Sequence, residues 1–247
     1  MKKDGYAIVT GGNRGIGKAC AMQLAEEGYD VVINYTSDRG HPYAEETLKE
    51  LKEKGVDAIS VRADVSEYEG CKKIVDKAVE TFGKNITVLV NNAGIAYGKP
   101  FHEVTPDQIE KIIRTNLLSQ LFCANLILPY MMEQNKGWII NISSNSGIMG
   151  VEGYVDYSAS KGGSIALTKA LAKEAAAYNI KVNCIAPGCF LSHIVTDSGE
   201  ENMERLRLLT PLKKLGEMTD IALLVHYLVN TEFLTGQVIS PNGGWTI

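Results

Sequence analysis

The sequence predicts an α/β protein of one domain, a Rossmann-type, doubly wound parallel sheet with helices on both faces, in three layers. Apolar runs of strand length alternate with amphipathic helical stretches through the 247 residues, which is typical of a parallel sheet covered by helices. A (β/α)8 barrel shows the same alternation, but a glycine-rich loop directly after the first strand favours the open sheet. No linker, repeat or low-complexity segment divides residues 1–247, so we expect a single domain.

The individual elements follow from local patterns. Short apolar, β-rich runs predict strands at 6–10, 30–35, 57–62, 87–90, 138–142, 180–185 and 237–240. Helical periodicity predicts helices at 16–27, 44–54, 106–129, 157–178 and 219–229, and another that ends at 82. Stops are expected at Gly28, Gly55 and Gly83.

Two helix starts carry capping signals. Ser66 and Glu69 fit a capping box for the helix that ends at 82. Thr105 stands as an N-cap before Pro106, a residue that suits the first helical position.

The composition argues against several kinds of protein. The net charge is −4, the pI is about 5.7 and no basic run occurs, which argues against nucleic acid or an anionic membrane as partner. No apolar stretch approaches the ~20 residues of a membrane span, and the first apolar run is too short for a signal peptide, so a cytoplasmic location is expected. The five cysteines are scattered and the four histidines lack metal-ligand spacing, so we expect neither disulfides nor a metal.

The loop TGGNRGIG, at 10–17, places glycines between the first strand and the first helix. Glycine lets the backbone approach a pyrophosphate, and a helix N-terminus supplies N–H donors and the positive end of a dipole. The spacing is GxxxGxG rather than GxGxxG. Its place in the first strand–helix unit indicates a dinucleotide site.

The end of the second strand predicts which dinucleotide binds. An acid there accepts a hydrogen bond from the adenosine ribose 2′-hydroxyl and selects NAD. This strand ends in NYTS, at 34–37, without an acid, and Arg14 and Arg39 stand close to it in the predicted fold. Cations and hydroxyls suit a 2′-phosphate, so we expect NADP(H). The alternative is that Arg14 is merely solvated and that Asp38 reaches the ribose.

Tyr157 and Lys161 are four residues apart, about one helical turn, so their side chains project from one face of the predicted helix. A free tyrosine has a pKa of roughly 10 and is a poor acid or base at neutral pH. A nearby ammonium favours the phenolate and lowers that pKa, which would suit the pair to donating and accepting a proton. Such a pair also occurs by chance on half-exposed helices, so the assignment of a catalytic role depends on the other motifs.

Three motifs occur in a fixed order: TGxxxGxG at 10–17, NNAG at 91–94 and YxxxK at 157–161. With this set the sequence resembles the short-chain dehydrogenase/reductase family over essentially the whole chain. Within the family it is most similar to the 3-oxoacyl-[acyl-carrier-protein] reductases, through VTGGNRGIG, LVNNAGI, INISS…YSASKGG, VNCIAPG and LTGQ…NGG.

The resemblance implies catalytic roles for four residues. Tyr157 would be the general acid in ketone reduction and the base in alcohol oxidation, and Lys161 would lower its pKa and hold the nicotinamide ribose. Ser144, with Ser143 as its structural neighbour, would orient and polarise the substrate oxygen. Asn116 would hold a water that links Lys161 to solvent, although in mid-helix it could also be a satisfied polar residue.

The same resemblance implies the cofactor contacts. Asp64 and Val65 match the pair that meets the adenine ring, although Asp64 could instead be a cap. The NNAG stretch would shape the adenosine side, although its asparagines could simply form a turn. Pro187 and Gly188 match the nicotinamide wall, and Ser192 aligns with a threonine that often touches the carboxamide. The full expected set is Gly11, Asn13, Arg14, Gly15, Ile16, Gly17, Tyr35, Ser37, Asp64, Val65, Asn92, Ala93, Gly94, Tyr157, Lys161, Pro187, Gly188 and Ser192.

The stretch 188–207 follows the sixth strand and shows no periodicity. Open α/β sheets bind ligands at this end, so we expect a substrate loop or lid there, with a merely disordered surface loop as the alternative. The resemblance also implies a homotetramer, in which the apolar end at 243–247 would suit burial at a contact.

The predicted function is NADP(H)-dependent reduction of a ketone to a secondary alcohol, with 3-oxoacyl-[acyl-carrier-protein] as the leading substrate. Three departures argue against docking of a carrier protein: 133–138 holds one cation, Tyr178 stands where an arginine is frequent, and 241–244 reads PNGG where VDGG is usual. The alternatives are an alcohol dehydrogenase for a free ketone, hydroxysteroid or sugar, and a non-catalytic nucleotide-binding protein.

Overall fold

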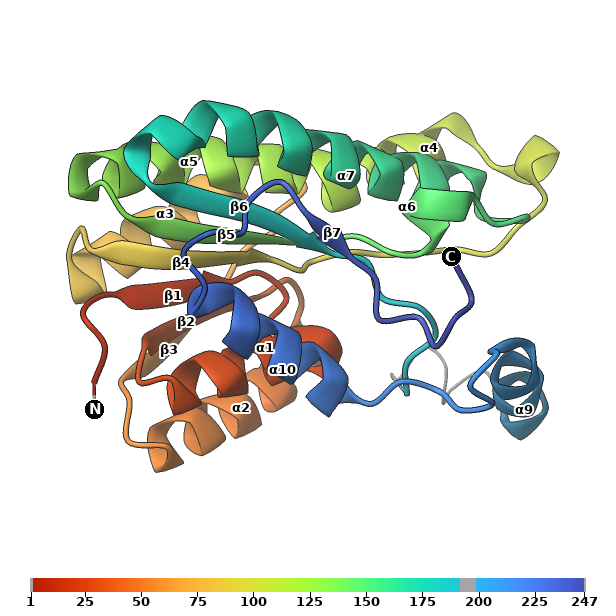
Figure 1. The fold of residues 1–247 in the computed structure, drawn as a ribbon, viewed down its shortest axis with the longest axis horizontal. Helices are drawn as coiled ribbons and strands as arrows, with labels where there is room; N and C mark the ends of the chain where they lie inside the picture. Colours follow the sequence, from red (N-terminus) through yellow and green to blue (C-terminus); the bar gives the residue numbers. More distant parts are fainter. Residues whose placement is uncertain (1, 192–198, 247) are drawn as a thin grey trace.

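Seven parallel strands form one sheet in the order β3-β2-β1-β4-β5-β6-β7 in the computed structural model, which describes residues 2–191 and 199–246 (Figure 1). The order runs outward from β1 on one side and from β4 on the other, so the predicted doubly wound open sheet is confirmed and the barrel is excluded. The strands are β1 (Tyr6–Val9), β2 (Asp30–Tyr35), β3 (Ala58–Arg62), β4 (Ile86–Asn91), β5 (Gly137–Ile142), β6 (Ile180–Ile185) and β7 (Val238–Ile239).

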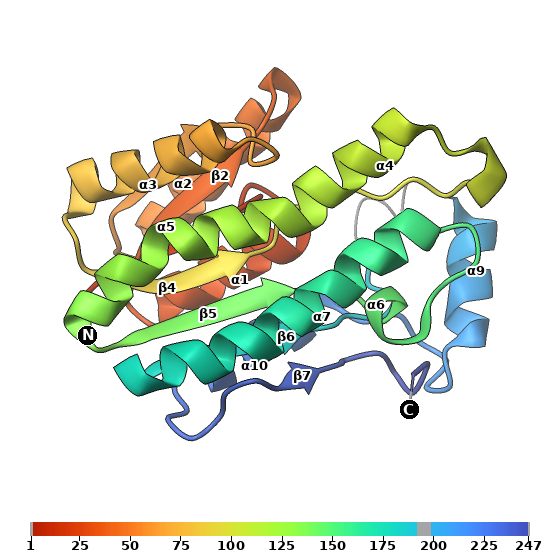
Figure 2. The same cartoon turned by 90° about the horizontal axis from the view of Figure 1, so that it is seen from above.

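Helices cover both faces of the sheet and give the three predicted layers (Figures 1 and 2). One face carries α1 (Gly15–Glu26), α2 (His41–Glu53) and α10 (Met218–Val229), and the other carries α3 (Tyr68–Phe82), α5 (Ser119–Gln134) and α7 (Val155–Ala175). Three shorter helices lie toward the carboxyl ends of the strands: α4 (Pro106–Ile113), α6 (Ser146–Met149) and α9 (Glu200–Leu209). Short 3-10 turns are η1 (Asp38–Gly40), η2 (Phe101–Glu103) and η4 (Ala176–Tyr178).

Both faces of the central strands are buried, and alternate residues pack into the two helical layers. In β1, Ala7 and Val9 pack with α1, α2 and α10, whereas Tyr6 and Ile8 pack with α3 and α5. None of the four is more than 2% exposed. For this reason the strands occur in the sequence as continuous apolar runs rather than as alternating ones.

Several predicted helix boundaries are confirmed. The stops at Gly28, Gly55 and Gly83 hold, and each of these glycines has a positive φ, which only glycine adopts freely. Thr105 caps α4 as predicted. Its hydroxyl accepts from the Gln108 amide, and the Gln108 side chain accepts from the Thr105 amide.

The capping box expected at Ser66 and Glu69 is wrong. α3 begins at Tyr68 with Glu67 as its N-cap, and no side-chain cap bond forms there. The Ser66 amide donates instead to Asp64 Oδ1 at 3.0 Å. Ser66 therefore belongs to a turn closed by the Asp64 side chain, one residue ahead of the N-cap.

The prediction of a single helix at 106–129 is also wrong. This stretch of the chain forms α4, a π-helical segment η3 (Arg114–Leu118) and the first part of α5. α5 continues past Pro129 to Gln134, and Asn135 ends it in the left-handed conformation with φ 51°. Ile127 and Met131 are fully buried against the sheet, which offsets the helical hydrogen bond that Pro129 cannot make.

The irregular stretch expected at 188–207 is in part helical. Residues 192–198 lie outside the described part of the chain, and α9 follows them. α9 has no buried residue, and its apolar side chains Met203 and Leu206 are only half-buried. Figure 1 shows α9 apart from the two helical layers, beside the carboxyl ends of the strands.

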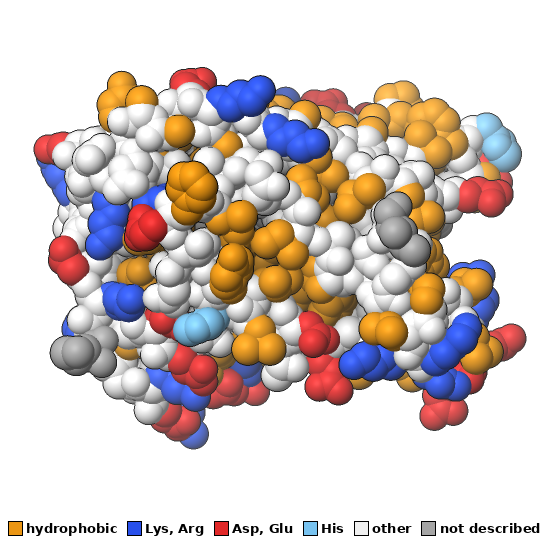
Figure 3. Space-filling model, viewed as in Figure 1, with side chains coloured by type: hydrophobic (Ala, Val, Ile, Leu, Met, Phe, Trp, Pro, Cys, Tyr) orange, Lys and Arg blue, Asp and Glu red, His pale blue; other side chains and the backbone are white. Residues whose placement is uncertain are grey.

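Apolar side chains also remain on the surface. Figure 3 shows a group of them in the middle of the face seen in Figure 1, over β7 and toward α10. Leu223 and Tyr227 on α10 are 66% and 52% exposed, and Phe233, ahead of β7, is fully exposed. Such groups suit a protein–protein contact. The homotetramer, with burial of 243–247, stays a prediction.

Candidate active site

The predicted site residues that the structure describes lie at the carboxyl ends of β1 to β6 or on the helices beside them. β1 and β4 are neighbours in the sheet, but the chain leaves them toward opposite faces. After β1 it enters α1, and after β4 it continues toward α4 and α5 on the other face. This divergence opens a crevice at the strand ends, the place where doubly wound sheets bind ligands.

The glycine loop permits a close approach of its backbone. A Cβ on Gly17 would lie 2.1 Å from Gly11 O, and one on Gly12 would lie 2.8 Å from the Ile33 side chain. Gly15 begins α1 with φ +55°, and nothing lies within 4 Å of the position that its Cβ would take. The first turn of α1, which includes Ile16, therefore begins beside open space, and this arrangement fits the pyrophosphate of a dinucleotide.

Polar side chains from β2 and β4 hold the glycine loop in place. Asn92 Nδ2 donates to the carbonyls of Thr10 and Gly11, at 2.9 and 3.0 Å. The Thr10 hydroxyl accepts from the amides of Asn92 and Ala93, at 3.0 and 3.1 Å. Asn34 Oδ1 accepts from the Gly11 amide at 3.3 Å. Asn92 and Ala93 thus support the crevice and do more than turn the chain.

The end of β2 is ordered by contacts with η1 and α2. Tyr35 OH lies 3.0 Å from His41 Nδ1. Asn13 Nδ2 donates to Gly40 O at 3.1 Å, which joins the glycine loop to η1. Ser37 is the N-cap residue of η1 and is exposed.

Charged side chains surround this strand end. Asp38, the acid considered for the ribose, forms an ion pair with Arg62 at the end of β3. Arg14 and Arg39 are both exposed. The Arg14 guanidinium lies 5.8 Å from the Tyr43 ring.

Asp64 and Val65 follow β3. Val65 is 1% exposed, whereas Asp64 is exposed and accepts from the Ser66 amide. A Cβ on Gly70 would lie 1.8 Å from Asp64 O, so α3 packs tightly on this turn. Asp64 therefore has a local turn-forming role, close to the alternative that the sequence left open.

Lys161 is almost fully buried, at 3% exposed, which is unusual for an ammonium group. Its Nζ donates to Ile142 O at 2.8 Å and lies 5.7 Å from the centre of the Tyr157 ring. Burial lowers the pKa of Lys161 from 10.5 to about 8, and the nearby Cys184 opposes this effect. The ammonium thus loses its proton closer to neutral pH than a free lysine does, which suits proton transfer.

The net shift of the Tyr157 pKa is upward, and the lowering expected from Lys161 stays a prediction. Burial raises the pKa of Tyr157, the hydrogen bond with Ser144 opposes the rise, and Tyr154 adds to it. The Lys161 ammonium is itself desolvated and bound to a carbonyl, so it does not outweigh the burial of the phenol. Tyr157 is therefore protonated at neutral pH, the form that donates a proton.

Asn116 lies on η3 and is fully buried. Its Oδ1 accepts from Ile95 N and its Nδ2 donates to Ile95 O, both at 2.8 Å, and Nδ2 also donates to Ser160 Oγ at 3.1 Å. A Cβ on Gly94 would lie 3.3 Å from Asn116 Oδ1 and 3.4 Å from Lys161 Nζ. Asn116 thus holds the loop after β4 beside Lys161, and the water assigned to it stays a prediction.

Ser143 and Ser144 follow β5 and make different contacts. The Ser143 hydroxyl donates to Lys161 O at 2.7 Å, which ties β5 to α7. The Ser144 hydroxyl accepts from the Ser146 amide at 3.1 Å and donates to Asn145 Oδ1 at 3.2 Å, and its proximity partly offsets the rise that burial causes in the pKa of Tyr157. Ser144 is 8% exposed, so its hydroxyl is largely withdrawn from solvent, whereas Tyr157 as a whole is half-buried.

The loop after β6 is fixed between the ends of β5 and β7. Asn145 N donates to Pro187 O at 2.9 Å, and Gly188 N donates to Pro241 O at 3.0 Å. A Cβ on Gly188 would lie 2.8 Å from Asn242 Cα, so the chain passes close there. The predicted nicotinamide wall is a braced segment at the strand ends.

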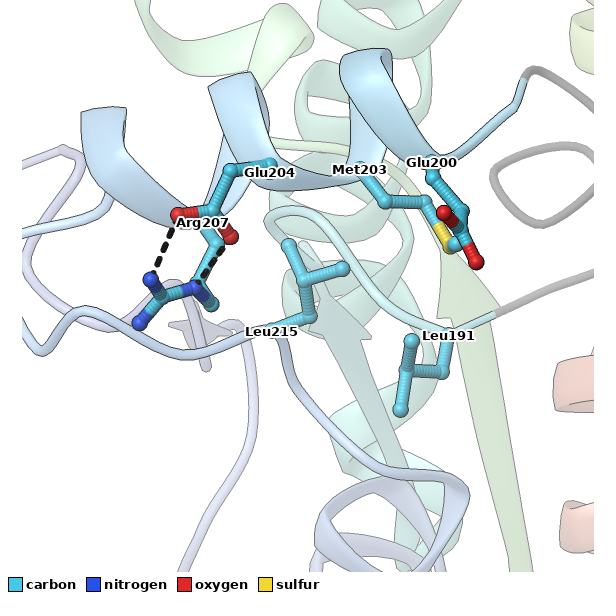
Figure 4. A pocket seen from close by; sticks show the side chains of 6 residues that line it. All are labelled: Leu191, Glu200, Met203, Glu204, Arg207 and Leu215. Atoms are coloured by element: carbon cyan, nitrogen blue, oxygen red, sulfur yellow. Dashed lines mark hydrogen bonds and ion pairs between the residues drawn. The ribbon is translucent and has the colours of Figure 1, made fainter.

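A pocket of about 420 Å³ lies under α9, and Figure 4 shows that its lining side chains come from α9 and from the chain below it. Arg207 donates to both carboxylate oxygens of Glu204, at 2.7 and 2.6 Å, so their charges offset each other. Ser192, a predicted carboxamide contact, lies outside the described residues, and the substrate role of 188–207 stays a prediction. The lining residues are Leu191, Glu200, Met203, Glu204, Arg207 and Leu215.

Sequence reasoning missed several supporting residues. Thr10 and Asn34 cross-link the strand ends, and their signal was a polar residue at the end of a buried apolar strand. Ser160 connects Asn116 to the Tyr157 carbonyl. Nothing in the sequence except its position in the helix could have indicated this role. Ile142 acts through its backbone carbonyl, which no side-chain pattern indicates.

The chain belongs to the short-chain dehydrogenase family, because the family model for short chain dehydrogenases matches residues 5–203. Over 246 residues it is 39% identical to a 3-oxoacyl-[acyl-carrier-protein] reductase of Staphylococcus aureus strain Mu50, with 99% of both chains covered. Over 244 residues it is 40% identical to an acetoacetyl-CoA reductase of Shinella zoogloeoides, with 96% of this chain and 97% of that one covered.

Two solved structures are similar over nearly the whole chain. Levodione reductase superposes with a TM-score of 0.92 at 29% identity and covers 99% of this chain and 98% of its own. A structure from Sinorhizobium meliloti 1021, titled as a short-chain alcohol dehydrogenase, gives 0.91 at 33% identity, with 99% and 97% covered. The predicted family and fold are confirmed, and the chain is an oxidoreductase of a family that uses nicotinamide cofactors.

Within 2–191 and 199–246, no group of three or more His, Cys, Asp or Glu side chains is placed to hold a metal ion. No helix in these ranges has both the length and the apolar character to cross a membrane. Cys20, Cys71, Cys123 and Cys184 are buried free thiols, and Cys189 is a half-buried one.

Lys161→Met should stabilise the fold at neutral pH. The pKa of Lys161 is about 8 in the folded chain against 10.5 when exposed, so between these values the unfolded chain binds more protons and wild-type stability rises with pH. Below pH 8 the wild type bears the full cost of burying the charge. After the lost bond to Ile142 is allowed for, we expect the variant to be more stable by about 2 kcal/mol there.

Urea unfolding at pH 7, 9 and 10.5 would measure this effect. The advantage of Lys161→Met should shrink as pH rises above 8 and vanish near 10.5. Lys169→Met, at an exposed position of the same helix, is the control and should change stability little at any pH. A stability difference that does not depend on pH would contradict the buried charge.

Proposed function

We propose that this chain is an NADP(H)-dependent reductase that converts a ketone into a secondary alcohol, with a 3-oxoacyl thioester as its substrate. One observation carries the proposal: the hydroxyls of Tyr157 and Ser144 and the buried ammonium of Lys161 meet beside the dinucleotide crevice. Burying an ammonium beside a tyrosine ring is costly, so the arrangement is not expected on a helix face where the two residues occur together by chance.

The two hydroxyls provide the electrostatic part of the reaction. A bound nicotinamide supplies hydride chemistry. As the substrate carbonyl is reduced, negative charge develops on its oxygen. The Ser144 hydroxyl acts directly on the Tyr157 phenol, so the two hydroxyls are near enough to donate to one substrate oxygen. Fixed donors of this kind contribute several kcal/mol, about 3, to stabilisation of the transition state.

The proton comes from Tyr157 OH. Burial keeps this hydroxyl protonated before the reaction, so it can donate to the substrate oxygen. The phenolate that remains lies beside the desolvated ammonium of Lys161, and opposite charges attract more strongly where water is excluded. Because the pKa of Lys161 is about 8, it can return a proton near neutral pH.

For the cofactor we favour NADP(H) on the charges around the end of β2. Arg14 and Arg39 are exposed there, and guanidinium groups suit the 2′-phosphate of the adenosine ribose. Asp38 is engaged by Arg62, which makes it a weaker partner for a ribose 2′-hydroxyl. This supports NADP(H) over the alternative in which Asp38 selects NAD.

For the substrate, two relatives support a 3-oxoacyl thioester. The reductase of Staphylococcus aureus is named for a 3-oxoacyl group on a carrier protein, and that of Shinella zoogloeoides for acetoacetyl-CoA. The pocket under α9 adds a physical argument, because Leu191, Met203 and Leu215 give it an apolar lining that suits an acyl chain.

A free ketone is the second candidate, and one surface favours it. Asn179 Nδ2 donates to Asn135 O at 3.3 Å, so the two stretches that depart from the carrier-protein reductases lie side by side. Tyr178, at 40% exposed, presents a phenol on this surface where an arginine is frequent in those enzymes.

The lysines of this surface are already engaged. Lys181 is 5% exposed, pairs with Glu232 and lies 5.1 Å from the Trp138 ring. Lys136 Nζ lies 5.8 Å from the same ring. The surface therefore offers little unengaged positive charge to an acidic carrier protein.

Tyr157→Phe should lower kcat/KM for ketone reduction by about 10²–10⁴-fold, because it removes the proton donor and leaves the ring. The Kd for NADPH, measured by fluorescence titration, should stay within about twofold, because the ring position is kept. Tyr178→Phe is the matched control and should leave both values unchanged. Full turnover by Tyr157→Phe would refute the catalytic assignment.

Arg14→Ala and Arg39→Ala should each raise the Kd for NADPH by about tenfold and leave the Kd for NADH within about twofold. The reason is that each removes a cation expected at the 2′-phosphate, a group that NADH lacks. Isothermal titration at low and high salt would measure both dissociation constants, and the rise in the Kd for NADPH should be smaller at high salt. A wild type that binds NADH tenfold more tightly would contradict the cofactor proposal.

Initial rates of NADPH oxidation test the substrate. Acetoacetyl-CoA and acetoacetyl-carrier protein should be compared with a panel of steroid, sugar and simple ketones. Turnover of the thioesters, enhanced by the carrier domain, would support the leading proposal. Turnover confined to a free ketone would support the second candidate, and no reduction of any ketone would contradict both.

A further inference from the structure

The carbonyl at the end of β5 accepts hydrogen bonds from two side chains. The ladder between β4 and β5 ends at Asn91 and Asn141, so Ile142 O lies one residue beyond the last pair. Lys161 Nζ, from α7, donates to Ile142 O at 2.8 Å. Gln120 Nε2, from α5, donates to the same oxygen at 3.3 Å. A carbonyl oxygen has two lone pairs and can accept both.

The amide of Gln120 serves little else. The residue is 1% exposed, and its Oε1 has no hydrogen-bond donor within the described part of the chain. A buried amide oxygen without a donor is destabilising, so a leucine of similar size would serve packing better. The part of Gln120 that is used is therefore its NH2 group, on the carbonyl that it shares with Lys161.

We propose that Gln120 is a positioning residue for Lys161, which keeps the Ile142 carbonyl bonded so that the ammonium can leave it for the cofactor. While Gln120 donates to Ile142 O, movement of Nζ toward a ribose hydroxyl leaves no buried carbonyl unpaired. Without Gln120 that movement would strand the carbonyl, and Lys161 would stay on it. The inference rests on the proposed function in one respect, that a nicotinamide cofactor is a second partner of Lys161.

The shared acceptor also affects the charge of Lys161. The positive end of the Gln120 amide lies at the same oxygen as the ammonium and disfavours it. The titratable groups next to Lys161 are Tyr157 on its own helix and Cys184 on β6, whereas β5, η3 and α5 face it with carbonyl and amide groups. Burial raises the pKa of Tyr157, and that of Cys184 to about 11, so neither is charged near neutral pH.

Gln120→Leu and Gln120→Glu test the proposal. Leucine removes the donor and keeps the size, and a carboxylate can only accept. The first measurement is the pKa of Lys161 in the cofactor-free protein, from ¹³C NMR of labelled lysine with the signal assigned by Lys161→Arg. We expect a rise of about half a pKa unit with leucine and a larger rise with glutamate. The second is the Kd for NADPH, which should rise by about 3–10-fold in both variants.

Gln134→Leu is the matched control. Gln134 is on the same helix, but its Nε2 donates to Lys84 O and Tyr130 O, both at 2.9 Å and remote from the strand end. It should change neither the Lys161 pKa nor the Kd. If Gln120→Leu fails to fold, Gln120→Glu gives both measurements by itself.

The results separate this inference from the proposed function. An unchanged or lowered Lys161 pKa in the Gln120 variants would overturn it. A raised pKa with an unchanged Kd would overturn it too, because release of Nζ would then not depend on Gln120. Neither measurement needs a substrate. A protein that reduces no ketone would refute the proposed function, and the NMR and binding data would still test the role of Gln120.

Discussion

The burial of the Lys161 ammonium is the constraint on which the site depends. A desolvated ammonium needs a strong acceptor, and the Ile142 carbonyl at the end of β5 is the acceptor here. β5 extends one residue beyond its last pair with β4, which frees the Ile142 carbonyl to accept from Nζ. The chain leaves β4 at the same place, and this departure also opens the cofactor crevice. One topological feature therefore provides both the crevice and the acceptor for the lysine.

A polar layer inside the apolar core fixes α7 against the sheet. Asn91 Nδ2 donates to Asn141 Oδ1, and Asn141 Nδ2 donates to Thr168 Oγ1, both at 2.9 Å. The Ser143 hydroxyl adds a bond to the Lys161 carbonyl. These bonds set the axial position and rotation of α7, and so they decide where its two catalytic candidates project. Such a layer costs more to bury than apolar side chains, and the extensive apolar packing around it offsets this cost.

Local patterns predicted the fold and the central pair, and tertiary effects decided the rest. Tyr157 and Lys161 could be placed together because helical spacing is local. The direction of the Tyr157 pKa could not be predicted, because it depends on how deeply two separate elements bury the phenol. The π-helical turn at 114–118 has no compositional signal, and α9 has no buried face to produce one. At Ser66 two local motifs competed, and the turn formed with Asp64.

The cofactor and substrate ends of the site are held very differently. Bonds between Thr10, Asn34 and Asn92 join three strands around the glycine loop, so few substitutions there would be neutral. α9 has no buried residue, and the chain after it is held by the buried Thr210 and by the bond from Leu212 N to Gly243 O. Side chains on α9 can therefore change without disturbing the lysine or the crevice. An exposed helix apart from the strand ends can vary between relatives while the residues at the strand ends keep their places.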